Sequence, residues 1–226
     1  MTPHSIINSH HIMAAKRQWV ELLGATSLTF LKPRFKRFLM PVSARLVRAG
    51  VVANQVTAVS IVGSLFMGGM LSTFHSHRAL FGLLPVWLLV RMACATIDGT
   101  LAIDFGQKSL FGGILNEVGD VVSDVVLLLP LAFVGPFTPI SVGAMVVVTV
   151  ASEVAGMLGP MIGGSRRVDG PMGKADRGIA LGVLGLCICH GQLPFVVAWV
   201  ALPFGSLLTI TTLNRLYFAW TEAADD

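Results

Sequence analysis

Charged residues are scarce in this chain. Only 12% of its 226 residues are Asp, Glu, Lys or Arg, whereas 54% are hydrophobic and the mean hydropathy is +0.77. A soluble domain usually carries about twice that charged fraction, and a soluble core of this length could not bury so much apolar surface. Lipid must therefore cover part of the chain, which excludes an ordinary soluble enzyme and predicts one compact membrane domain.

Cysteine is also scarce. The three cysteines, Cys94, Cys187 and Cys189, all lie in apolar stretches, and no two of them have the CxxC spacing. An odd number of cysteines without this spacing supports neither a disulfide framework nor a zinc site. We interpret them as small apolar core residues.

Long apolar stretches are abundant. Six of them are each close to the roughly 20 residues that a helix needs to cross a bilayer. They run approximately over residues 52–74, 79–102, 109–134, 137–159, 178–194 and 195–217. The last two are separated only by Leu193-Pro194-Phe195. The pattern predicts an all-α fold, a polytopic membrane helix bundle with six transmembrane helices.

The basic residues, which give a net charge of +4 and a pI of about 9.3, gather between these stretches. A cytoplasmic N-terminus puts fourteen of the sixteen Lys and Arg on the cytoplasmic side, with Arg78 outside and Arg91 within the second span. The positive-inside rule therefore predicts that both termini are cytoplasmic. The same distribution favours membrane orientation over nucleic-acid binding. Because no targeting signal is evident, we expect a bacterial plasma membrane.

Residues 33–48, PRFKRFLMPVSARLVR, alternate apolar and basic side chains at helical spacing. We expect an amphipathic helix that lies in the membrane interface, with its cations near anionic headgroups. A plain topology signal is the alternative. The expected organisation is an N-terminal tail and pre-helix at 1–32, a membrane domain at 33–217 and a C-terminal tail at 218–226.

Ionisable residues within membrane spans are costly and usually functional. Those of this chain are Arg91, Asp98, Glu117, Asp120, Asp124 and Glu153. In the third span, Gly112, Asn116, Asp120 and Asp124 recur every four residues. Four residues advance about 400° on a helix, so these side chains share one face. A connection of about six residues makes spans two and three antiparallel neighbours, which should bring Asp98 to the depth of Asn116.

Carboxylates that face a membrane cavity can bind cations. Oxygen ligands suit Mg²⁺ or Mn²⁺, which in turn hold a diphosphate, and one carboxylate could instead work as a general base. A small transporter with an ion or proton path through Asp120, Asp124 and Glu153 is an alternative. That alternative predicts inverted repeats or broken helices, and the sequence shows neither clearly.

Residues Ala95 to Asp120 resemble the signature of the CDP-alcohol phosphatidyltransferases, D-x2-D-G-x2-A-R-x8-G-x3-D-x3-D. The chain matches five of its eight positions without a gap. The matching residues are Asp98, Gly99, Ala102, Gly112 and Asp120. Residues 52–57, VANQVT, also resemble the T-P-N-x-x-T motif at the start of the family's first membrane helix. The resemblance covers roughly residues 33–217.

This resemblance implies a phosphotransferase of phospholipid biosynthesis. It would move a phosphatidyl-type group from a CDP-linked lipid, expected to be CDP-diacylglycerol, to an alcohol and release CMP. One or two Mg²⁺ or Mn²⁺ ions would be held by Asp98, Asn116 and Asp120, and Asp120 would also be the base on the acceptor hydroxyl. The residues that would shape the CDP pocket are Gly99, Ala102 and Gly112. Family members commonly dimerise, so the resemblance also allows a homodimer.

Three signature positions depart from the family pattern. Ala95 and Asn116 stand where the family has aspartates, and Ile103 stands where it has arginine. The amide oxygen of asparagine can coordinate a metal but adds no charge. Glu117, about 100° around the helix, Asp124, one turn deeper, and Asp104 are candidate substitutes. A catalytically degenerate family member that binds CDP-lipid or partners is therefore an alternative interpretation.

The segment between spans four and five, residues 163–178, reads GGSRRVDGPMGKADRG. Guanidinium groups bind phosphates well, and Gly173-Lys174 resembles a basic element near this loop in the family. We expect Arg166, Arg167 and Lys174 to bind the phosphate of an acceptor such as glycerol 3-phosphate or inositol phosphate. A topology signal is again the alternative.

Overall fold

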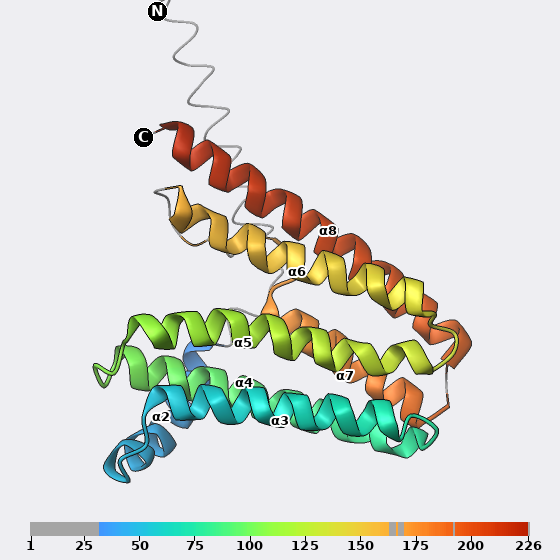
Figure 1. Cartoon of the computed structure of the whole chain (residues 1–226), viewed down its shortest axis with the longest axis horizontal. Helices are drawn as coiled ribbons and strands as arrows, with labels where there is room; N and C mark the ends of the chain where they lie inside the picture. The colour runs from blue at the N-terminus through green and yellow to red at the C-terminus, as the bar shows by residue number, and fades with distance from the viewer. Residues whose placement is uncertain (1–31, 163–165, 167–169, 192, 226) are drawn as a thin grey trace, which may run out of the picture.

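The structure is a computed structural model that describes residues 32–162, 166, 170–191 and 193–225. Within these ranges it contains helices and no strand, which confirms the all-α prediction (Figure 1). The α-helices are α2 (Lys32–Arg48), α3 (Ala53–Thr73), α4 (Leu83–Ile103), α5 (Leu110–Leu128), α6 (Pro139–Met161), α7 (Lys174–Cys189) and α8 (Leu193–Asp225). Two 3₁₀-helices, η2 (Arg78–Gly82) and η3 (Leu129–Phe133), precede α4 and follow α5.

The long helices form a bundle in which α3 packs against both α4 and α5 (Figure 1). α7 packs against α4, and α6 lies side by side with α8. Direct backbone contact between α4 and α5 is sparse, although the six-residue connection from Asp104 to Ser109 makes them antiparallel as predicted. The two acid-bearing helices therefore meet through side chains, with α3 alongside.

Three helical stretches are long and apolar enough to cross a membrane, judged over the described residues by length and composition. They are Ala53–Thr73, Arg78–Ile103 and Pro139–Met161, and they correspond to the first, second and fourth predicted spans. α5 carries three carboxylates and α7 has only 16 residues. The six-span count therefore stays a prediction, and the helical elements themselves lie where the apolar stretches placed them.

The break between α7 and α8 lies earlier than predicted. α7 ends at Cys189, and Gly191 has a φ of +70°, a backbone region that residues with a side chain rarely adopt. Pro194 falls in the first turn of α8, where the missing N–H has no helical acceptor to lose. A glycine turn, rather than the proline, separates the two helices.

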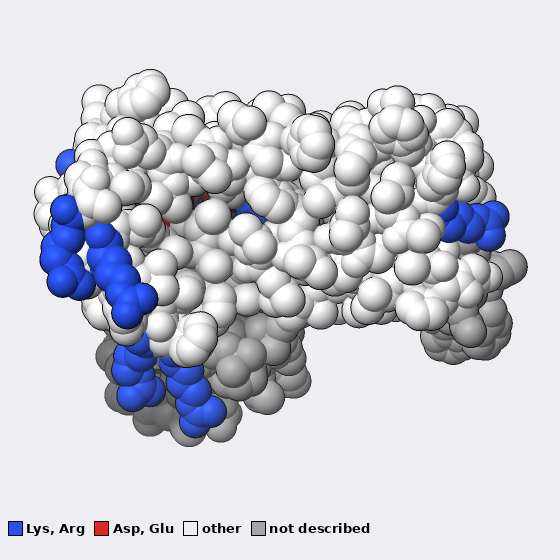
Figure 2. Space-filling model, turned by 90° about the horizontal axis from the view of Figure 1, so that it is seen from below, with Lys and Arg blue, Asp and Glu red and all other residues white. Residues whose placement is uncertain are grey.

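Residues 33–48 form a helix, as predicted. The exposed basic residues of α2 are Arg34, Arg37, Arg45 and Arg48, and Leu39 and Ser43 are buried. Figure 2 shows most of the visible Lys and Arg gathered at the end of the molecule that carries α2, next to a long face with few charged side chains. This distribution agrees with the expected membrane orientation. The interfacial position of α2 and the cytoplasmic termini stay predictions.

Glycines, which have no side chain, let α3 and α5 approach each other closely beside the acidic residues. A Cβ on Gly68 would collide with the carbonyl oxygen of Val126, and a Cβ on Gly119 would collide with Cδ1 of Ile61. Glycines at such points allow close helix approach. The start of α5 is held by Ser109, whose Oγ accepts a hydrogen bond of 3.0 Å from the backbone N of Gly112.

Candidate active site

A small cavity lies among α3, α4 and α5. Its lining residues are Thr57, Ser60 and Ile61 of α3, Ala95 and Asp98 of α4, and Asn116, Gly119, Asp120 and Ser123 of α5. The structure thus brings together Asp98, Asn116 and Asp120, which the sequence predicts as metal ligands. It also places Ala95, the departure from the signature, in the same cavity.

Asp98 is a buried carboxylate with little compensation for its charge. It is 7% exposed, and Thr57 Oγ1 donates a hydrogen bond of 2.8 Å to its Oδ2. No Lys or Arg among the described residues lies within ion-pair distance of it. A buried charge without a partner is unfavourable. The surroundings of Asp98 are therefore suited to binding a cation.

Asp120 lies across the same cavity, but both of its carboxylate oxygens have cationic partners. Arg91 Nη2 donates to Oδ1 and to the main-chain oxygen of Asp120, at 3.2 Å each. Lys174 Nζ donates to Oδ2 at 2.5 Å. The cavity therefore contains one carboxylate without a cation and one that is neutralised by two side chains from α4 and α7.

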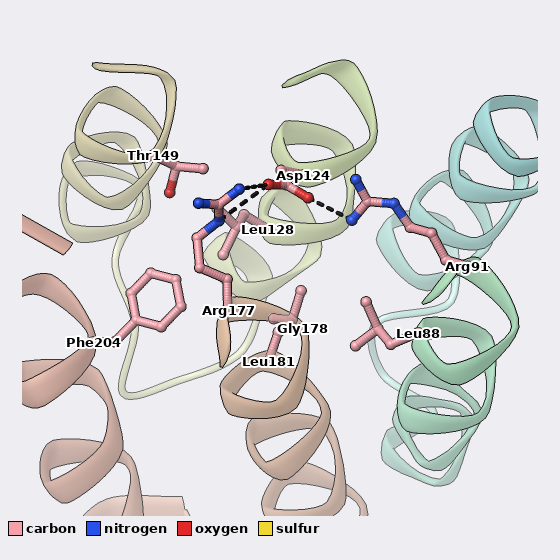
Figure 3. Close-up of a pocket in the computed structure, with 9 residues that line it drawn as sticks. All are labelled: Leu88, Arg91, Asp124, Leu128, Thr149, Arg177, Gly178, Leu181 and Phe204. Atoms are coloured by element: carbon pink, nitrogen blue, oxygen red, sulfur yellow. Dashed lines mark hydrogen bonds and ion pairs between the residues drawn. The ribbon is translucent and has the colours of Figure 1, made fainter. Parts of the chain in front are cut away.

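A buried ion-pair network adjoins the cavity. Asp124 accepts hydrogen bonds from Arg91, at 2.5 Å, and from Arg177, at 2.7 Å, as Figure 3 shows. Arg177 Nη2 also donates to Oε1 of Glu153 at 2.7 Å, and Arg215 Nη1 lies 3.4 Å from the same oxygen. Glu153, at 2% exposed, is thus fully paired. These contacts join α4, α5, α6, α7 and α8.

Arg166 and Lys174 extend this network to a partly exposed edge. Arg166 Nη2 lies 2.8 Å from Oε2 of Glu117, and Lys174 Nζ lies 3.5 Å from Oε2 of Glu153. The side chains of Arg166 and Lys174 are 40% and 36% exposed. Across the described residues, five cationic side chains meet four carboxylates in the network. Its two partly exposed cations, Arg166 and Lys174, suit an anionic ligand.

Comparison with known proteins identifies the family. The chain is 38% identical over 158 residues to the inner membrane protein YnbA of Escherichia coli K12, an alignment that covers 70% of this chain and 78% of YnbA. The chain belongs to the YnbA family. No protein-family model matches it. The inner membrane relative and the three apolar helices confirm the prediction of a membrane protein.

The chain is also homologous to the phosphatidylinositol phosphate synthase of Mycobacterium bovis, with 25% identity over 207 residues that cover 87% of this chain and 93% of the synthase. The crystal structure of the Mycobacterium tuberculosis synthase with CDP-DAG bound has a TM-score of 0.64 at 22% identity and covers 84% of this chain and 98% of that one. A second structure, with manganese and citrate, has a TM-score of 0.58 at 20% identity, covering 82% and 91%. The predicted resemblance to CDP-alcohol phosphatidyltransferases is confirmed as homology and as a shared fold.

The three residues that the sequence predicts to shape the CDP pocket, Gly99, Ala102 and Gly112, do not line this cavity. A Cβ on Gly112 would collide with Oδ1 of Asn54, so the glycine makes room for that side chain. A Cβ on Gly99 would meet nothing within 4 Å. Ala102 packs against the small apolar cluster that α2, α3 and α4 form. Of the three, Gly99 leaves open space that a ligand could use.

The candidate substitutes for the missing aspartates have other partners. Glu117 pairs with Arg166, Asp124 with two arginines and Asp104 with Lys36. None of the three lines the cavity around Asp98. Arg167, the remaining predicted phosphate ligand, lies outside the residues that the structure describes.

Sequence reasoning did not select the hydroxyl groups of the cavity. Thr57, Ser60 and Ser123 line it, and Thr57 binds Asp98 directly. A signal was present, since Thr57, Ser60 and Ser64 are polar residues three and four positions apart in an otherwise apolar stretch. That spacing marks one helix face, and all three residues are buried.

The donor atoms of the cavity fit a divalent cation of the Mg²⁺ or Mn²⁺ type. The described residues include no group of three His, Cys, Asp or Glu that could hold a metal unaided. Two carboxylates and an amide oxygen are nevertheless hard oxygen ligands, and Mg²⁺ commonly binds one or two carboxylates together with water and phosphate oxygens.

Proposed function

We propose that this protein is a membrane CDP-alcohol phosphatidyltransferase that moves the phosphatidyl group of CDP-diacylglycerol to a phosphorylated alcohol and releases CMP. One observation carries the proposal. Asp98, Asn116 and Asp120 share a cavity, and the partly exposed Lys174 contacts Asp120. A cation site thus lies directly beside an anion site. Homology to the phosphatidylinositol phosphate synthases supports the same reaction class.

On the donor side, Asp98, Asn116 and Asp120 supply the oxygen ligands for a divalent cation. A bound Mg²⁺ or Mn²⁺ supplies neutralisation of the charge on the donor diphosphate. Thr57 orients the Asp98 carboxylate through its hydrogen bond of 2.8 Å to Oδ2. The other oxygen of Asp98 is then left for coordination, and the open space at Gly99 accommodates part of the CDP group.

On the acceptor side, Arg166 and Lys174 bind the acceptor phosphate. Their present partners are the carboxylates of Glu117, Asp120 and Glu153. Both cations are partly exposed, and a phosphate offers them a stronger acceptor with more oxygens. Arg177, in contrast, is buried between Asp124 and Glu153 and holds the network in place.

Asp120 is the proposed general base. When Lys174 binds the acceptor phosphate, Oδ2 of Asp120 becomes free to accept the proton of the acceptor hydroxyl. The hydroxyl oxygen bonds to the phosphatidyl phosphorus, and the bond from that phosphorus to the CMP phosphate oxygen breaks. CMP leaves with the electron pair, and the hydroxyl proton stays on Asp120.

The test is CMP release by purified protein given CDP-diacylglycerol and Mn²⁺, with glycerol 3-phosphate or inositol phosphate against glycerol or inositol. We expect release only with the phosphorylated acceptors. Asp98→Asn should lower the rate about 10²- to 10³-fold, because several kcal/mol of charge stabilisation is lost.

Asp104→Asn is the matched control, because Asp104 follows α4 directly and pairs with Lys36 at 2.7 Å, outside the cavity. It should keep the wild-type rate. No CMP with any acceptor, while CDP-diacylglycerol still binds, would replace the proposal with a degenerate family member that binds the lipid without turnover.

A further inference from the structure

We propose that Arg91 is a positioning residue that fixes Asp120 and occupies the place beside it where a second metal ion would bind, so that this site binds one divalent cation. The inference rests on the proposed function and deepens it. It concerns the number of ions and the orientation of the base, which the comparisons do not determine.

Arg91 is held firmly against α5. It lies one helical turn before Ala95 on the same face of α4. Its guanidinium donates to Asp124 Oδ1 at 2.5 Å, and to Oδ1 and the main-chain oxygen of Asp120 at 3.2 Å. The side chain is 14% exposed and reaches from α4 towards Asp124 (Figure 3). Three hydrogen bonds to one helix leave it little freedom.

The two cations on Asp120 differ in what they can do. Lys174 is 36% exposed and can turn to an acceptor phosphate. Arg91 has no such alternative, because Asp124 holds it as well. A second divalent ion on the Oδ1 side of Asp120 would therefore meet a fixed guanidinium 3.2 Å from its own ligand atom. Like charges at such distances repel strongly in a protein interior.

The carboxylate count leads to the same number of ions. The family signature carries four aspartates, and this chain has Ala95 and Asn116 in place of two of them. Asp98 is the carboxylate of the cavity that no described cation neutralises, whereas Asp120 is paired with Arg91 and Lys174. The charge left in the cavity therefore suits one divalent ion. Because Arg91 holds Oδ1, it also leaves Oδ2 of Asp120 directed to the hydroxyl proton.

The test counts Mn²⁺ bound to purified protein in detergent, with saturating CDP-diacylglycerol, by electron paramagnetic resonance of the free ion. Wild type should bind one ion. The double variant Ala95→Asp with Asn116→Asp should still bind one, because Arg91 still occupies the Oδ1 side of Asp120. Adding Arg91→Met to that double variant should raise the count to two.

Arg91→Lys keeps one positive charge, so it should keep one ion while CMP release falls about 10- to 100-fold, the usual cost of losing the group that orients a ligand. Arg78→Met in η2, at the opposite end of α4, is the matched control and should match wild type in both measurements.

Two ions in wild type, or two in the double variant with Arg91 present, would overturn the inference. A folded triple variant that binds one ion would do the same. If the triple variant does not fold, the ion counts of wild type and of the double variant still test whether the site binds one ion. A wild type that binds one ion but releases no CMP would contradict the proposed function and leave the ion count standing.

Discussion

Asp98 and Asp124 are carboxylates on neighbouring apolar helices, and their surroundings differ. Asp98 accepts a hydrogen bond from Thr57 and has no cationic partner among the described residues, whereas Asp124 lies between Arg91 and Arg177. A buried charge is stable only with partners. Asp124 therefore serves the packing of the bundle, and Asp98 is left for a ligand. Within one acidic cluster, Asp124 therefore has a structural role and Asp98 a ligand-binding one.

The same substitution at these two positions should affect stability differently. Asp124→Asn leaves two buried guanidinium groups without their shared charge, so the free energy of unfolding should fall by about 3 kcal/mol. Without divalent cations, Asp98→Asn should leave it unchanged or raise it by about 1 kcal/mol, because an unpaired charge is removed. Denaturant unfolding in detergent measures both, and an equal loss at the two positions would contradict the distinction.

The hydroxyl group of Thr57 should contribute to metal binding, because it orients Asp98. Thr57→Val removes the hydrogen bond to Asp98 and should weaken Mn²⁺ binding about tenfold, as is usual for a group that orients a metal ligand. Thr73→Val, near the exposed end of the same helix, loses only a bond to the carbonyl oxygen of Gly69 and is the control. Equal Mn²⁺ affinity in Thr57→Val and wild type would show that Asp98 needs no such support.

The smallest expected effect concerns Glu117. Glu117→Gln frees Arg166 from a partly exposed ion pair worth up to about 1 kcal/mol, so the KM for a phosphorylated acceptor should fall by at most about fivefold. Asp104→Asn, which frees Lys36, should leave that KM unchanged. A fall in Mn²⁺ affinity instead would show that Glu117 substitutes for a missing aspartate as a metal ligand.

The transporter alternative gains no support from the contacts. Its expected path used Asp120, Asp124 and Glu153, and each of these carboxylates is paired with Arg or Lys side chains. A path for cations through three neutralised carboxylates would first require these pairs to open. The cavity around Asp98 and the partly exposed cations fit a bound anionic substrate better.

Much of the candidate site followed from local rules. The four-residue spacing in α5 and the short connection to α4 predict that Asp98, Asn116 and Asp120 meet, and all three line one cavity. The buried ion-pair network could not be predicted from local rules. Arg177 pairs with Glu153 across 24 positions and Arg215 with the same residue across 62, on three different helices. No sequence spacing encodes which faces of separate helices come together.

The sequence by itself determined the helices, the membrane character and the face that carries the acidic residues, because hydrophobicity and helical period act within a few turns of chain. Only the tertiary structure decided which carboxylate is compensated and which is left to bind a ligand. Charge compensation depends on distances of a few ångströms between groups, and here α4, α5, α6, α7 and α8 supply those groups.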